Sequence, residues 1–286
     1  MSDQIVPFVF ENLPVRGSVI QLERSWQRMI GEHDYAPVVV ETLGQAAAAT
    51  GLIAHSLKFD GSVTMQIQSS GELRMLVMQC TSELEMRGMA VTSDTHEAQT
   101  FADLLDKAHC AITVDNGERP YQGIVEVSAE SLVASLENYF GRSVQVPSLL
   151  ALFADGSKTG GILLQQMPGQ TGLADDDWAR LGFILDTLTF DEMTGDEPMR
   201  LIGKLFAEDD VRVFGPHPVA FHCPCSRARA EEVLKMLGEE DAIDAVETQG
   251  TIRVTCEYCG RERGFDAVDI SKLFADNVVA GSKIVQ

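Results

Sequence analysis

The sequence predicts an α+β protein with a large N-terminal domain (residues 1–170), an acidic helical linker (171–220) and a small C-terminal domain (221–286). Short segments of alternating apolar and polar residues, separated by turn residues, predict an antiparallel sheet with packed helices in the first part. After residue 170 the composition becomes strongly acidic, and the last part carries two close pairs of cysteines. These three observations indicate the order of the domains.

The length and the net charge narrow the class of protein. The chain has 286 residues, of which 45% are hydrophobic, so it can bury one large and one small core. Forty-three acidic residues against twenty-two basic ones give a formal charge of −21, which repels phosphate backbones and anionic lipid surfaces. We therefore expect neither nucleic acid nor a membrane as a partner.

The N-terminal sequence MSDQIVPFVF lacks the basic and then apolar pattern of a secretory signal. The longest uncharged run, residues 42–57, is shorter than a transmembrane span. We expect a cytoplasmic protein, because a reducing compartment suits cysteines that bind metal or sense redox state. Cys80 and Cys110 stand alone among apolar residues, so we expect them to be buried, inert thiols.

The first elements of the N-terminal domain are a strand and two helices. Residues 16–23 alternate like a strand, and apolar residues from Trp26 onward have helical spacing. Pro37 restarts the chain before a longer helix over 40–57, whose tract AAAATG lets another backbone approach closely. We expect this helix to be buried flat against a sheet. His55 near its end is expected to be a structural histidine rather than a catalytic one.

The next segments predict the sheet, with methionines filling the core between strands. The strands are expected at 62–68, 73–80, 84–91, 111–115, 121–127, 149–155 and 160–167. A helical turn at 101–105 and a helix over 131–141, with Gly141 as its C-terminal stop, connect them. The sequence contains no glycine-rich phosphate loop, nucleophile elbow or HExxH motif.

The linker combines high charge with apolar stripes. Residues 171–210 carry eleven acidic and three basic side chains, a net charge of −8. Two stripes at helical spacing predict amphipathic helices, and they consist of Trp178, Leu181, Ile184, Leu185 and Leu188, and of Met199, Ile202, Leu205 and Phe206. The helices are either an ordinary packed pair or a metastable element. In the second case the C-terminal domain braces them, and its loss exposes apolar surface.

The four paired cysteines carry the main chemical signal. Cys223 and Cys225 form a C-x-C pair, and Cys256 and Cys259 form a C-x-x-C pair. Four thiolates are the ligand set of a tetrahedral zinc site, and they leave no coordination position open for hydrolytic chemistry. The site is either a structural clip or one whose sulfurs can be oxidised. The C-x-C pair favours oxidation, because so short a disulfide is strained and labile.

A zinc ion would form part of the fold of this short domain. His217 and His222 are weaker ligand candidates, since four thiolates already complete the site. Between the pairs, residues 228–246 are expected to be helical, with a break at Gly238 and an apolar face of Val233, Leu234, Leu237 and Ile243. The run TIRVTCEYCGRERGFD predicts a hairpin, and we expect metal removal to unfold the domain.

The runs FGPHPVAFHCPCSRAR and VTCEYCGRERGFD resemble the 33 kDa heat-shock chaperonin family. The runs RGSVIQL, HDYAPVVVETLGQAAAATGLIAHSLKFDGSVTMQIQ and YQGIVEV, and the ENYF helix, occur in the order of that family's N-terminal domain, so the resemblance covers nearly the whole chain. No zinc ligand is missing. The resemblance implies an ATP-independent holdase rather than an enzyme. It is inactive when reduced and zinc-bound, and it is activated by disulfide formation, zinc release and linker unfolding.

For this sequence the resemblance implies one Zn²⁺ per chain, bound by Cys223, Cys225, Cys256 and Cys259. It also implies that oxidation joins the first two cysteines and the last two, that unfolding proteins are the clients, and that the oxidised form is a homodimer. The alternative is an enzyme with a pocket in the N-terminal domain and a purely structural zinc module. A zinc ribbon that binds nucleic acid is disfavoured, because residues 221–286 have a net charge of −4.

Overall fold

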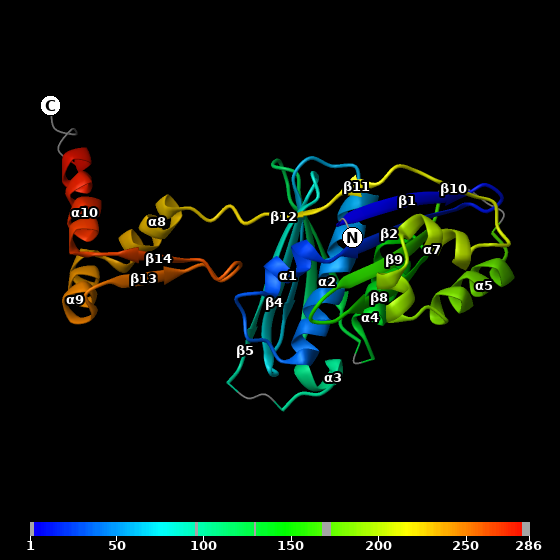
Figure 1. Ribbon diagram of the computed structural model, residues 1–286, viewed down its shortest axis with the longest axis horizontal. Coiled ribbons are helices and arrows are strands. Elements are labelled where there is room, and N and C mark those ends of the chain that lie inside the picture. The colour runs from blue at the N-terminus through cyan, green and yellow to red at the C-terminus, as the bar shows by residue number, and fades with distance from the viewer. Residues whose placement is uncertain (1–2, 95–96, 129, 168–172, 282–286) are drawn as a thin grey trace. The chain divides into compact units, whose positions relative to one another are not determined.

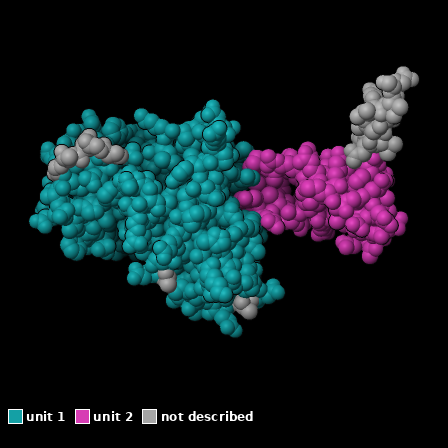
Figure 2. All heavy atoms as spheres, turned by 180° about the vertical axis from the view of Figure 1, so that it is seen from behind, with its two compact units in different colours: residues 1–222 teal, residues 223–286 magenta. Residues whose placement is uncertain are grey.

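The computed structural model describes residues 3–94, 97–128, 130–167 and 173–281. The chain forms two compact units, Met1–His222 and Cys223–Gln286, which Figure 2 shows in two colours. Each unit is described here by itself. The division into three domains at residues 170 and 220 remains a prediction, while the α+β class with antiparallel sheets is confirmed.

The first sheet of the larger unit has six antiparallel strands in the order β10-β1-β2-β9-β8, with β11 paired to β1 (Figure 1). The strands are β1 (Gln4–Phe10), β2 (Val15–Leu22), β8 (Ser148–Ala154), β9 (Thr159–Gln166), β10 (Val211–Val213) and β11 (His217–Pro218). The expected strand at 16–23 is therefore β2. β10 and β11 follow residues 171–210, which we call the acidic segment. Residues far apart in the sequence therefore complete one sheet.

The second sheet has the order β12-β5-β4-β3-β6-β7. Its strands are β3 (Ser62–Gln68), β4 (Leu73–Thr81), β5 (Glu85–Thr92), β6 (His109–Asp115), β7 (Tyr121–Glu126) and β12 (Ala220–Phe221). The predicted meander is confirmed for β3 to β5, and β6 returns to the free edge of β3. β12 pairs in parallel with β5.

Helix α2 (Pro37–Ser56) is the centre of the larger core and packs against strands of both sheets (Figure 1). Its tract Ala46–Ala49 is fully buried. A Cβ atom on Gly44 would lie 2.4 Å from the side chain of Ala154, so only glycine permits this approach. The helix is long and apolar enough to cross a membrane, but 78% of its most apolar stretch is buried inside the protein, as in a core helix. The expected close packing is confirmed.

Shorter helices complete the core: α1 (Arg24–Ile30), α3 (Phe101–Leu104) and α4 (Leu132–Tyr139). The prediction that the last of these ends at Gly141 is wrong, because the chain continues as a π-helical turn over Phe140–Val144. Gly141 lies inside that turn and has open space around it. The left-handed residue that ends the turn is Gln145, with φ of 58°.

The acidic segment forms α5 (Asp175–Asp186), α6 (Phe190–Gly195) and α7 (Pro198–Leu205). These helices cover the face of the first sheet opposite α2. From the sheet, the shared core contains Val6, Phe8, Phe10, Val15, Val19, Ile162 and Leu164; from the acidic segment, it contains Leu181, Leu185, Leu188, Met193, Leu201, Ile202 and Phe206. Both predicted stripes are thus largely buried, although Met199 is exposed.

The smaller unit contains α8 (Arg227–Leu237), α9 (Glu239–Gln249), the hairpin of β13 (Ile252–Thr255) and β14 (Glu262–Phe265), and α10 (Ala267–Gly281). The break at Gly238 and the hairpin are confirmed. The predicted apolar face is wrong in part, because Val233, Leu237 and Ile243 are exposed. Leu234 of the predicted face is buried, together with Val246 and with the small residues Ala230 and Ala242, which let the helices approach closely.

Candidate metal centre

The four paired cysteines come together in the smaller unit. Cys223 and Cys225 precede α8, and Cys256 and Cys259 lie in the turn of the β13–β14 hairpin. All four Sγ atoms lie within 4.8 Å of one another, with 3.7 Å between Cys223 and Cys256 and 3.5 Å between Cys225 and Cys259. Thiolates about 2.3 Å from a tetrahedral zinc are roughly 3.8 Å apart, so the donor set fits this metal.

Backbone hydrogen bonds shape the hairpin turn that carries the second pair. The Cys256 N–H donates to the Arg261 carbonyl at 3.1 Å, and the Cys256 carbonyl accepts from the N–H groups of Cys259 at 3.3 Å and Gly260 at 2.8 Å. Gly260 has a φ of 64°, a left-handed conformation that glycine adopts without strain. The turn thereby places both thiols on the same side as the first pair.

Side chains around the cluster fix the first pair. The Ser226 hydroxyl caps α8 by accepting the Arg229 N–H at 3.2 Å, so the helix begins directly after Cys225. Arg263 donates to the Cys225 carbonyl at 3.3 Å and thus connects the first pair to β14. Arg227 lies 4.4 Å from the centre of the Phe265 ring. Sequence reasoning did not assign these roles, although a serine before a helix is a recognisable cap signal.

The thiols influence one another's ionisation. Burial, together with hydrogen bonds to neighbouring thiols, raises the pKa of Cys259 to about 12, and burial also raises the pKa of Cys223. Burial opposes ionisation of Cys225 too, but hydrogen bonds from the other thiols, Cys259 foremost, outweigh it and lower its pKa. Four thiolates this close repel one another unless a cation lies among them, and a divalent metal supplies that charge.

The other cysteines and histidines lie apart from this cluster. His222 Nδ1 is 2.6 Å from Glu85 Oε2, and His217 lies against His55, so neither histidine belongs to the group of possible ligands. Cys80 and Cys110 are buried, and burial raises the pKa of each thiol to about 12. These two thiols are therefore poorly reactive, as expected from the sequence.

A family model described as "Hsp33 protein" matches residues 3–266. The chain belongs to the Hsp33 family. The resemblance inferred from the cysteine motifs is thereby confirmed, and it extends over nearly the whole chain.

Relatives of the Hsp33 family in two bacteria match along almost their full length. The 33 kDa chaperonin of Methylobacillus flagellatus is 39% identical over 98% of this chain and 97% of that protein. The 33 kDa chaperonin of Nitrosococcus oceani is 39% identical over 97% and 96%. The crystal structure of the 33 kDa chaperonin of Thermotoga maritima matches with a TM-score of 0.79, 20% identity and 97% coverage of this chain (99% of that chain), which shows a shared fold.

Proposed function

We propose that this chain is a redox-regulated, ATP-independent holdase chaperone that binds unfolding proteins under oxidative stress. The observation that carries the proposal is the convergence of four thiols within 4.8 Å in a chain of the Hsp33 family. The full-length relatives are named 33 kDa chaperonins. We also propose that the protein is cytoplasmic and that its oxidised form is a homodimer.

In the reduced form, Cys223, Cys225, Cys256 and Cys259 would hold one Zn²⁺. When bound, the metal supplies charge neutralisation and a cross-link between the start of α8 and the hairpin. Among the described side chains of this unit, the buried core comprises Ala230, Leu234, Ala242, Val246, Phe265, Ile270, Leu273 and Phe274. A core of this size rarely folds without a metal or disulfides, so zinc occupancy would set the folded state of the unit.

Oxidation would remove the ligands in pairs. In each step two thiolates form one disulfide and release two electrons, which, together with two protons from the solvent, reduce one molecule of hydrogen peroxide to two molecules of water. We propose that Cys223 joins Cys225 and that Cys256 joins Cys259. Because a disulfide sulfur is a poor zinc ligand, the first step would weaken metal binding and the second would abolish it.

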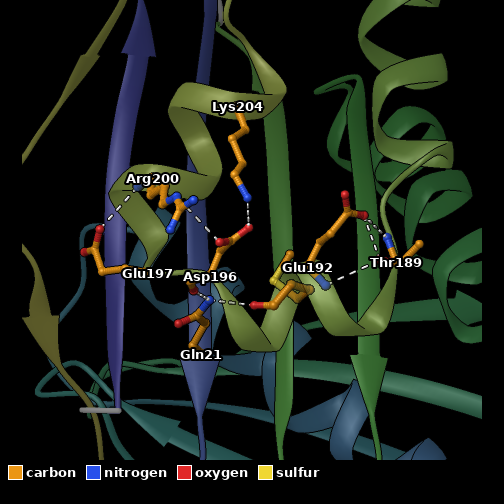
Figure 3. A network of polar contacts seen from close by, with 8 residues as sticks. Gln21, Thr189, Glu192, Asp196, Glu197, Arg200 and Lys204 are labelled. Atoms are coloured by element: carbon orange, nitrogen blue, oxygen red, sulfur yellow. Dashed lines mark hydrogen bonds and ion pairs between the residues drawn. The ribbon is translucent and has the colours of Figure 1, made fainter.

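The acidic segment supplies the surface to be exposed. Its helices cover apolar residues of the first sheet, and Gln21 and Lys158 donate hydrogen bonds to main-chain carbonyls of α6 and the residue after it. Arg180 forms a bidentate ion pair with Asp209 at 2.9 and 2.7 Å, and Asp196 lies near Arg200 and Lys204 (Figure 3). Like charges along the segment repel and favour its release. Release would expose a contiguous apolar face, which is the kind of surface that binds unfolding proteins.

The test is light scattering of an aggregating client protein in the presence of this protein. One sample is reduced and zinc-loaded, another is oxidised with peroxide at mildly raised temperature, and a chromogenic chelator reports released zinc. We expect suppression of aggregation only after oxidation and in proportion to zinc release. The double variant Cys80→Ala, Cys110→Ala is the matched control, because it removes two thiols outside the cluster and should keep the switch.

Zinc release without suppression would show that the cluster is a structural clip. The enzyme alternative, with a pocket in the larger unit, would then return. No feature of the described residues favours that alternative at present, and turnover of a small substrate by reduced protein would be its support.

A further inference from the structure

A cavity of about 170 Å³ opens where α2 ends against the first sheet. His55 and Ser56 of the last helical turn form one wall, and Arg16, Ser18 and Gln165 rise from β2 and β9. Leu163 and Phe214 add apolar surface. We call this cavity the Arg16 pocket. Its volume accommodates a small ion with several waters, and its polar groups converge from three separate elements.

Arg16 is held in a fixed orientation. Its Nη2 donates to Gln165 Oε1 at 2.9 Å, and Gln165 is buried. The Gln165 amide cannot flip, because its Nε2 donates to Ser148 Oγ at 3.1 Å while the Ser148 hydroxyl donates to the Val146 carbonyl at 2.9 Å. This chain of hydrogen bonds uses one N–H of the guanidinium. The remaining donors stay available to a ligand, in the planar arrangement that suits oxyanions.

One histidine lines the pocket and a second one lies against it. The ring centres of His55 and His217 are 5.0 Å apart, and His55 Nδ1 lies 3.4 Å from Ser18 Oγ. Burial foremost, then the charges of His217 and Arg16, lower the pKa of His55 to about 4. The two groups whose charge lowers this pKa are Arg16 on β2 and His217 on β11, and both are cationic when charged.

The pocket contrasts with the rest of the molecule. The chain has a net charge of −21, yet within its described residues no carboxylate forms an ion pair with Arg16. By comparison, Arg180 and Arg212 each contact an aspartate or glutamate. A half-buried, oriented arginine with no counter-charge among the described residues leaves a positive potential for a ligand to neutralise.

We propose that the Arg16 pocket binds one small tetrahedral dianion, of the class of inorganic phosphate or the phosphate group of a small molecule. Arg16 would bind two of its oxygens, and His55 would donate its Nε2–H while its Nδ1 accepts the Ser18 hydroxyl. The site includes none of the four paired cysteines. Phe214 and His217 belong to residues 214–219, which connect β10 to β12. The bound anion would therefore also stabilise the contact of this connection with α2 and β1.

The experiment uses the full-length, reduced, zinc-loaded protein in a phosphate-free and sulfate-free buffer. Inorganic phosphate is titrated by calorimetry, and the His55 ring signals are followed by NMR. We expect saturable binding at one site per chain, and a shift of the His55 signals with the same dissociation constant. Sulfate should compete and acetate should bind more weakly, because only the first is a tetrahedral dianion.

The variants separate the pocket from general charge effects. Arg16→Gln should weaken phosphate binding by roughly tenfold or more, because it removes charge-assisted hydrogen bonds. Arg253→Gln changes the net charge equally at an exposed ion pair with Glu262 in the smaller unit and should leave the affinity within roughly twofold. Fluorescence of the buried Trp26 checks that each variant is folded.

Three results would overturn the proposal: no saturable binding to the wild-type protein, equal affinity in the two arginine variants, or acetate binding as tightly as phosphate. The first needs no variant, so a folding defect cannot obscure it.

Discussion

The side-chain amide of Gln21 on β2 donates to the main-chain carbonyl of Asp196, which follows α6, at 2.9 Å. The same Nε2 donates to the Met193 carbonyl at 2.5 Å, so one buried side chain holds the end of α6 on the first sheet (Figure 3). Gln21 Oε1 is buried and has no hydrogen-bond partner among the described residues. Gln21 therefore anchors the acidic helices through donated bonds alone.

Replacing Gln21 by Met should loosen the acidic helices. The change removes two donated hydrogen bonds, but it also removes the buried oxygen that has no partner among the described residues. We therefore expect the packed helices to lose about 1 kcal/mol of stability. Hydrogen exchange read by mass spectrometry should show faster exchange in peptides from α6 and α7. Under the proposed function, activation should then need milder oxidation. Gln27→Met is the control, since Gln27 makes a single exposed contact with the Ser157 carbonyl at 3.2 Å. Equal exchange in both variants would exclude Gln21 as an anchor.

The free energy of unfolding of the larger unit should decrease as the pH decreases, because of His55. Its pKa is lowered from 6.5 to about 4 in the folded state, foremost by burial. Between these values the unfolded chain binds a proton that the folded chain does not, so stability decreases as pH falls through 6.5 towards 4. The full shift equals about 3 kcal/mol, and partial exposure to solvent reduces the expected effect to about 1–2 kcal/mol.

Urea unfolding followed by the fluorescence of Trp26 and Trp178 measures this effect at pH 7.5 and pH 5 in anion-free buffer. Both tryptophans lie in the larger unit. The variant His55→Gln should lose about 1 kcal/mol of the pH dependence. An identical pH dependence in both proteins would show that His55 is readily protonated in the folded state.

The two disulfides should form in a defined order. A disulfide between Cys256 and Cys259 spans a four-residue turn that already exists, in which the Cys259 N–H contacts the Cys256 carbonyl. A disulfide between Cys223 and Cys225 closes a smaller and more strained ring, so it should need stronger oxidation. We expect the second pair to oxidise first and not to activate fully alone. Thiol trapping and mass mapping after graded peroxide treatment test this order, and the idea fails if Cys223 and Cys225 always pair first.

The sequence predicted correctly that the four paired cysteines come together, because they form local pairs of a chemically distinctive residue. It also predicted α2, whose run of small residues has one structural use. β1 was missed because Pro7 interrupts an otherwise apolar run, although the Pro7 carbonyl accepts the Phe214 N–H in the sheet. β11 and β12 have only two residues each and show no periodicity.

Contacts between residues far apart in the sequence could not be predicted from local sequence patterns. Arg16 and Gln165 are 149 residues apart, and only the pairing of β2 with β9 brings them together. In the smaller unit, the prediction placed the larger apolar residues Val233 and Leu237 on the buried face. In the structure both are exposed, and close helix packing buries Ala230 and Ala242. Tertiary contact selected the small residues over the more hydrophobic ones.

Removing zinc under reducing conditions should unfold the smaller unit and leave the core around α2 of the larger unit folded. The smaller unit has one compact core, built from residues of α8, α9, β14 and α10, and the four thiols connect its hairpin to α8. Structural zinc contributes roughly 10–16 kcal/mol to folding in comparable small peptides, far more than such a core supplies. The larger unit has its own, much larger core around α2.

NMR after treatment with a chelator distinguishes the units. Amide signals of α8 and α9 should collapse to random-coil positions, while the Trp26 indole, which donates to the Asp155 carbonyl at 2.7 Å, keeps its folded signal. Cys256→Ser should produce the same spectrum without a chelator, and Cys80→Ala should not. If the smaller unit stays folded without zinc, metal release cannot be what unfolds it. Disulfide formation would then have to act on the acidic helices by another route.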